Sequence, residues 1–114
     1  MVTKAARAPC CFGARLRQAR ERLGLPQDKL GVMIGLDEGC SSARISRYET
    51  GVHEPAFDIA RKLAHALGIT VTYFYCEDDW LADMVLRLQT LTPIQRNGLE
   101  AWLSSTPKID ECCT

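Results

Sequence analysis

Residues 41–51 gather hydroxyl and guanidinium groups at helical spacing. Ile45 and Tyr48 lie three residues apart and can share one buried face of a helix. Four polar side chains gain nothing from burial and would point away from that face; they are Ser42, Arg44, Ser46 and Arg47. Such groups donate hydrogen bonds to phosphates and to the edges of bases. The stretch is therefore predicted to recognise an outside partner, and the major groove of DNA matches its chemistry.

Two residues are expected to delimit this helix. Ser41 can accept a hydrogen bond from the first free backbone N–H groups, as an N-cap residue does. Gly51 stands where helices commonly end in a left-handed residue. The pattern predicts a helix over residues 41–50, which follows a polar turn over residues 36–40 with a central glycine.

Neither histidine is placed for catalysis. His53 and His65 have no matched nucleophile or carboxylate nearby in the sequence. No glycine-rich phosphate-binding motif and no paired metal ligands occur either. We therefore expect no enzymatic activity and no cofactor, and we interpret His65 as a solvent-facing helix residue.

Six cysteines are a high count for 114 residues. None of the usual zinc-site spacings, such as C-x-x-C, occurs among them, so no metal site is predicted. Two vicinal pairs lie near the chain ends, Cys10–Cys11 and Cys112–Cys113, and a four-thiolate site built from both remains an alternative. Cys40 adjoins the polar helix, where redox sensing and an inert loop thiol are both open interpretations.

Charge is unevenly distributed along a chain whose net charge is zero. Residues 1–62 carry 11 Lys and Arg against 7 Asp and Glu, whereas residues 63–114 carry 3 against 7. A basic half that contains the polar helix favours an anionic partner such as DNA. A merely charge-balanced surface would also explain the count.

The composition argues against a membrane protein. Hydrophobic residues make up 46% of the chain, which is ordinary for a globular protein. Apolar runs are only a few residues long, too short to span a bilayer. Residues 1–9 lack the apolar core of a secretory signal, so a cytoplasmic location is expected.

The polar helix needs neighbours that bury its apolar face. Apolar residues recur at helical spacing, with glycine or proline near the ends, in helices predicted over residues 12–23, 26–35 and 56–67. The stripe of the last helix consists of Phe57, Ala60, Leu63, Ala64 and Leu67. Residues 69–75 have strand propensity but no partner strand, so a short helical turn that packs aromatic side chains on the core is preferred.

Two details of these helices carry further expectations. The apolar stripe of the first helix leaves a face of arginines that we interpret as solvated; it comprises Arg15, Arg17, Arg20 and Arg22. Gly31 in the middle of the second helix costs about 1 kcal/mol relative to alanine, which suggests close approach of another helix.

Two further helices are predicted over residues 78–91 and 93–103. The first has an apolar stripe of Leu81, Met84, Val85 and Leu88, and other apolar residues widen it. This is more apolar surface than a small domain covers alone. Dimerisation would bury it, with Trp80, Met84, Leu88 and Trp102 as candidate contacts. Packing back onto the first domain explains the pattern equally well.

Residues 12–75 resemble the Cro/cI-type (XRE-family) helix-turn-helix domain of bacterial and phage repressors. The resemblance covers over half of the chain, and its ordered set of motifs is specific although each piece alone is weak. The motifs are Leu16-Arg17, Gly24-Leu25-Pro26-Gln27-Asp28-Lys29-Leu30, Ile45-Ser46-Arg47-Tyr48-Glu49-Thr50-Gly51, Pro55 and Leu63-Ala64-His65-Ala66-Leu67-Gly68-Ile69.

The resemblance implies an all-α fold, a compact five-helix lambda-repressor-like DNA-binding domain with two additional C-terminal helices. Helices two and three of such a domain form the DNA-reading pair. Gln27 matches the position that grips phosphate and braces the recognition helix. Arg20 and Glu49 match a pair that ties helix one to the end of helix three, which would make Arg20 structural.

The resemblance also implies which side chains contact DNA. Ser42, Ala43 and Arg47 match positions that face base edges, with Arg44 and Ser46 beside them and Ser41 at the start of the helix. Because Ala43 can only touch a thymine methyl group, direct readout would fall mainly on Arg47. A bidentate contact to guanine would contribute about 1–3 kcal/mol of discrimination. Contact with phosphate and simple exposure are the alternatives for Arg47.

One departure from the family pattern concerns the turn before the recognition helix. The turn over residues 35–41 looks several residues longer than in the short repressors. Such an insertion is expected to tilt the recognition helix or to add a loop that contacts phosphate.

These observations predict a sequence-specific DNA-binding transcriptional regulator, more specifically a repressor that binds a pseudo-palindromic operator as a homodimer. Residues 1–11 would be a flexible basic arm, residues 12–75 the DNA-binding domain, and residues 76–114 a C-terminal extension for dimerisation with a frayed tail. An antitoxin-like or adaptor protein, whose C-terminal helices bind a protein partner, is the alternative.

Overall fold

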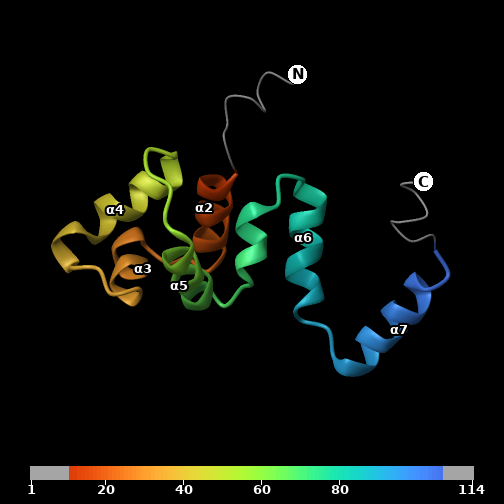
Figure 1. The fold of residues 1–114 in the computed structure, drawn as a ribbon. Helices are drawn as coiled ribbons and strands as arrows, with labels where there is room; N and C mark the ends of the chain where they lie inside the picture. The colour runs from red at the N-terminus through yellow and green to blue at the C-terminus, as the bar shows by residue number, and fades with distance from the viewer. Residues whose placement is uncertain (1–10, 107–114) are drawn as a thin grey trace, which may run out of the picture.

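The computed structural model describes residues 11–106, and this part of the chain is helical with no strand. In chain order the elements are α2 (Phe12–Arg22), α3 (Gln27–Met33), α4 (Glu38–Thr50), α5 (Phe57–Leu67), the 3-10 helix η1 (Val71–Tyr75), α6 (Asp79–Leu88) and α7 (Pro93–Leu103) (Figure 1). The predicted all-α fold is confirmed. The predicted helix bounds agree with the structure to within three residues at each end.

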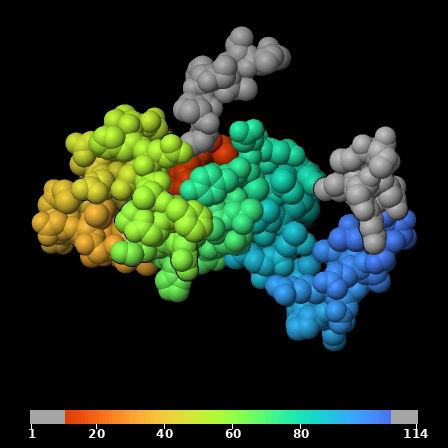
Figure 2. All heavy atoms as spheres, viewed as in Figure 1, coloured from red at the N-terminus to blue at the C-terminus, as the bar shows by residue number. Residues whose placement is uncertain are grey.

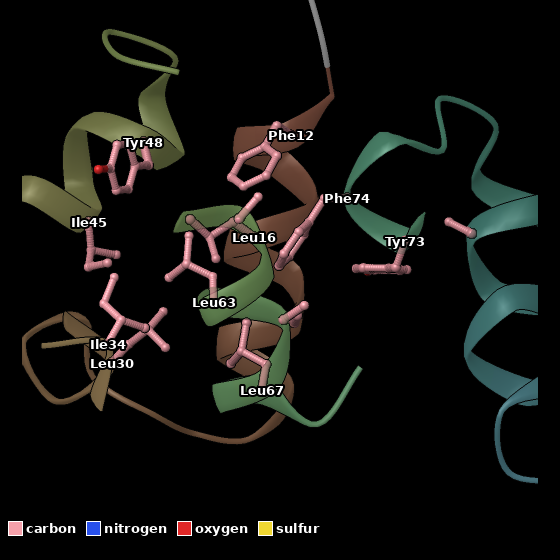
Figure 3. Close-up of a cluster of buried hydrophobic side chains, with 14 of the residues drawn as sticks. Phe12, Leu16, Leu30, Ile34, Ile45, Tyr48, Leu63, Leu67, Tyr73 and Phe74 are labelled. Atoms are coloured by element: carbon pink, nitrogen blue, oxygen red, sulfur yellow. The ribbon is translucent and has the colours of Figure 1, made fainter. Parts of the chain in front are cut away.

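The first four helices and η1 enclose one apolar core, which Figure 3 shows. Each of these five elements contributes a side chain with no exposed surface: Leu16, Leu30, Ile45, Leu63 and Phe74. Burial of one such side chain stabilises a fold by roughly 1.5–3 kcal/mol. The helix-turn-helix pair α3–α4 is therefore held on the body of the domain by its own apolar residues.

The start of α4 differs from the prediction. The helix begins at Glu38, after an N-cap at Asp37 that makes no side-chain capping bond, and not at Ser41. The connection from α3 is short, and Gly35 turns it with φ of 95°. The prediction of a lengthened turn was wrong, because the additional residues form a further turn at the N-terminus of the recognition helix.

Two glycines mark the closest approaches of helices. A Cβ atom on Gly31 would lie 1.8 Å from the Ser41 hydroxyl oxygen, so α3 meets α4 there and the predicted close approach is confirmed. A Cβ atom on Gly13 would lie 2.3 Å from the carbonyl oxygen of Glu49, so α2 meets the backbone of α4 there. Both contacts position the recognition helix against the domain.

The aromatic residues after α5 behave as expected. Residues 71–75 form a 3-10 helix, and Phe74 packs on Phe12 with ring centroids 4.6 Å apart. The prediction for Phe57 was wrong: although it follows the apolar stripe of α5, it lies at the first residue of that helix and is exposed.

The buried face of α6 is also different from the predicted stripe. Ala82 and Leu86 are buried, whereas Leu81 and Leu88 are exposed. The first turn of α6 is anchored to α2 by an ion pair between Asp79 and Arg15, at 3.0 Å. Ala82 and Leu86 follow Asp79 at helical spacing, and this face of α6, not the larger apolar stripe, packs on the core of the domain.

The last helix, α7, extends away from the other elements as an arm (Figures 1 and 2). It is well formed, because Thr92 and Gln95 make a capping box at its start. None of its residues is buried. Ile94 is 82% exposed and Trp102 is 64% exposed, and on α6 Trp80 is 67% exposed. Among the described residues, no helix has the length and apolar character needed to cross a membrane.

Candidate nucleic-acid interface

The outward face of α4 is polar and free of contacts that would hide it. Ser42, Ala43, Arg44 and Arg47 are exposed and Ser46 is half-buried. Within residues 11–106, the guanidinium groups of Arg44 and Arg47 make no ion pair. Two unpaired cations on the exposed face of a rigid helix suit an anionic partner.

The opposite side of α4 is held by a buried carboxylate. The Glu49 side chain is only 4% exposed, and it accepts hydrogen bonds from Nε and Nη2 of Arg20, which is 13% exposed. Arg20 also donates from Nη1 to the carbonyl oxygen of Leu25, at 3.0 Å. The hydrogen bond to Glu49 raises the pKa of Arg20, which burial opposes. The geometry of this pair matches the predicted structural anchor.

Gln27 continues this network toward the polar face. Its Nε2 donates to Oε1 of Glu49 at 3.0 Å, and its Oε1 accepts from the Ser42 hydroxyl at 3.3 Å. Hydrogen bonds therefore run from α2 through the start of α3 to the exposed side of α4. They restrain the rotation of α4 about its axis, which decides where Arg47 points.

Ser41 has a different place from the one expected. Its side chain is fully buried, and its hydroxyl donates to the carbonyl oxygen of Asp28 at 2.6 Å. A side chain in this position fixes the spacing of α3 and α4 and has no route to DNA. The predictions that Ser41 caps the helix and contacts DNA with its side chain are therefore corrected.

Comparison with known proteins decides the family. The helix-turn-helix family model, HTH_3, matches residues 16–74, which is more than half of the chain. The chain belongs to the helix-turn-helix family. A solved structure described as transcriptional regulator BswR is similar, with 36% sequence identity and a TM-score of 0.80 over 82% of this chain and 93% of that one. No curated protein sequence matches significantly.

The family match confirms the predicted helix-turn-helix membership, and α3 and α4, which pack on each other, both lie within the matched residues. Together with the regulator fold, it supports a DNA-binding regulator. The family match ends before α6 and α7, so the role of these two helices is taken up as a proposal below.

One important residue of the helix-turn-helix domain was misinterpreted in the sequence. Arg15 is only 4% exposed, not solvated. Its Nε donates to the Cys76 carbonyl oxygen at 2.8 Å and its Nη2 to the Glu77 carbonyl oxygen at 3.2 Å. The Arg15 guanidinium carbon also lies 5.8 Å from the centroid of the Tyr73 ring. It thus joins the helix-turn-helix domain to the start of α6, and neither its residue type nor its spacing distinguishes it in the sequence from Arg17 and Arg22.

The cysteines give no metal site in the described region. Among residues 11–106, no cluster of three or more His, Cys, Asp and Glu side chains could hold a metal ion. Cys10, Cys112 and Cys113, on which a four-thiolate site would depend, lie outside the described residues. Cys40 is exposed in the first turn of α4, and its sulfur lies 3.6 Å from the Asp37 carbonyl oxygen.

Proposed function

We propose that the chain is a sequence-specific transcriptional repressor that inserts α4 into the major groove as a homodimer. The observation that carries this proposal is the exposed face of α4, with two unpaired guanidinium groups on a helix braced by buried Glu49. A pre-ordered helix loses little conformational entropy on binding, so its contacts contribute directly to affinity and specificity.

The side chains divide into base readers and phosphate contacts. We assign Arg47 to guanine, through two hydrogen bonds to O6 and N7, and Ala43 to a thymine methyl group. Arg44, Ser42 and Ser46 flank these positions and suit phosphate or base-edge acceptors. Gln27 lies at the start of α3, where its backbone N–H can meet a phosphate while its side chain braces Glu49.

The apolar stripe of α6 supports a dimer. Trp80 and Leu88 are exposed, and half-buried Met84 lies between them at helical spacing. Trp102 adds an exposed ring on α7. Burial of this surface against a second copy would present two α4 helices to one face of DNA. The operator would then be a pseudo-palindrome with half-site centres about 10 bp apart, or a multiple of that spacing.

Replacement of Arg47 by alanine is expected to relax base preference at one position of each half-site. The loss should be about 1–3 kcal/mol of discrimination per half-site, because the bidentate contact to guanine disappears. The measurement is operator selection from a random DNA pool, followed by gel shifts with matched and single-base variants at fixed salt.

The matched control is Arg87→Ala on α6, which removes the same charge from an exposed ion pair with Asp83. It should leave the selected sequence unchanged. An Arg47→Ala protein that selects the wild-type sequence would remove Arg47 from base readout. Failure of the wild-type protein to enrich any sequence would refute the DNA-binding proposal as a whole.

The double variant Trp80→Gln/Leu88→Gln is expected to weaken self-association by at least about 10-fold, because central aromatic and aliphatic contacts dominate such interfaces. Sedimentation equilibrium over a concentration series measures this. Leu23→Gln, which changes an exposed leucine at the end of α2, is the control and should associate like wild type. A wild-type protein that stays monomeric at high concentration would contradict the dimer.

A second candidate is an antitoxin-like or adaptor protein that holds another protein with its C-terminal helices. It is supported by the absence of buried residues from α7, which leaves most of this arm accessible. Purification from the native host under mild salt distinguishes the two. A stoichiometric second polypeptide favours this candidate, whereas a clean homodimer favours the repressor.

A further inference from the structure

A groove of about 830 Å³ lies between the C-terminal end of α3 and one face of α5. These two helices lie side by side (Figure 1). Met33, Ile34 and Ala66 supply apolar atoms to the groove, and Gly35 lines it where the chain leaves α3. Its size falls within the range of roughly 300–1,000 Å³ that is usual for small-molecule sites.

The α5 side of this groove is basic. Arg61, Lys62 and His65 line it, and Asp58 is its single acidic lining residue. In the part of the chain that the structure describes, Arg61 and Lys62 form no ion pair, not even with Asp58 on their own helix. An unpaired guanidinium fork beside an ammonium group is suited to a carboxylate or phosphate group, which a guanidinium can bind through two hydrogen bonds.

The groove is separate from the proposed DNA interface. Gln27, which belongs to that interface, begins α3, whereas Met33 ends it. Seven residues of helix place the two about 9 Å apart along the axis. The apolar lining of the groove therefore lies at the opposite end of α3 from Gln27.

We propose that the α3–α5 groove binds a small amphiphilic anion. Its carboxylate or phosphate head pairs with Arg61 and Lys62, and its apolar tail covers Met33 and Ile34. Met33 is exposed although it is apolar, so a bound tail removes its surface from water. The tail also reaches Gly35, which lines the groove where the chain leaves α3.

Octanoate is a suitable probe, because it combines a carboxylate with an eight-carbon chain. Titrated into the full-length 15N-labelled protein, it should shift backbone amide signals of residues 33–36 and 58–66 in a saturable manner. Octanol has the same tail without the charge and should bind at least about 10-fold more weakly, because it lacks the charge-assisted hydrogen bonds. Octyl phosphate, as a third arm, shows whether the site prefers phosphate or carboxylate.

Two matched double variants decide the role of the cations. Arg61→Gln/Lys62→Gln should weaken octanoate binding at least about 10-fold, whereas Arg87→Gln/Arg96→Gln removes the same charge from α6 and α7 and should change it less than about twofold. Circular dichroism checks that both variants fold. Equal losses in both variants, equal binding of octanol and octanoate, or shifts centred on α6 and α7 would each overturn the proposal. DNA binding is not needed for any of these readouts.

Discussion

Glu49→Ala should lower the free energy of unfolding by about 3–5 kcal/mol, the usual cost of removing one partner from a buried ion pair. The substitution leaves two N–H groups of Arg20 without their acceptor in a site where little water can replace it. Gln27 also loses the acceptor of its Nε2 hydrogen bond. Urea unfolding followed by circular dichroism, at one fixed protein concentration, measures the change.

The chain contains a matched control for this prediction. Asp83 forms an ion pair with Arg87 at 3.0 Å on the surface of α6, with both side chains more than half exposed. Asp83→Ala should cost no more than about 0.5 kcal/mol, because water screens and solvates an exposed pair. Similar losses for Glu49→Ala and Asp83→Ala would mean that the carboxylate of Glu49 does not anchor the recognition helix.

Gly13→Ala is expected to destabilise the domain by about 3 kcal/mol, at the upper end of the usual range for overpacking. The new Cβ atom would lie 2.3 Å from the Glu49 carbonyl oxygen and 2.8 Å from that of Tyr48. Both are backbone atoms of α4, so no side-chain rotation relieves the clash. The helices must separate, which should also weaken operator binding in gel shifts.

Gly39→Ala provides the comparison, because a Cβ atom at Gly39 meets nothing within 4 Å. Alanine in a helix is favoured over glycine by about 0.5–1 kcal/mol, so this variant should be as stable as wild type or more so. If Gly13→Ala unfolds at the same urea concentration as Gly39→Ala, the close approach of α2 and α4 is not a constraint on the fold.

The sequence pattern predicted some helices better than others. Helix periodicity correctly located α2, α3 and α5, because each has only one apolar face and that face must be buried. Family motifs pointed to Arg20 and Glu49, whose pairing the structure contains. The outcome for α6 was different, because it has more apolar residues than one face can hold.

By itself, the sequence determined that the fold is all-α, that residues 12–75 carry a helix-turn-helix pattern, and that Gly31 marks a helix contact. These features depend on local spacing and on residue types with few alternatives. The tertiary structure decided the rest. By residue type, Asp37 and Ser41 are both suitable N-caps, and in the structure the N-cap is Asp37. Ser41 is buried against α3, because its small side chain fits beside Gly31 and its hydroxyl donates to the Asp28 carbonyl oxygen.

The burial of Arg15 and the rotation of α6 were likewise decided by the tertiary structure and not by the sequence. Apart from Arg20, the arginines on α2 look alike in the sequence, and only the Cys76 and Glu77 carbonyl groups, some sixty positions later, distinguish Arg15. On α6 the face of Ala82 and Leu86 is buried, and much of the larger apolar stripe stays outside. Spacing along a chain specifies which residues share a face. Which face is covered depends on contacts between residues far apart in the sequence, and these exist only once the helices are packed.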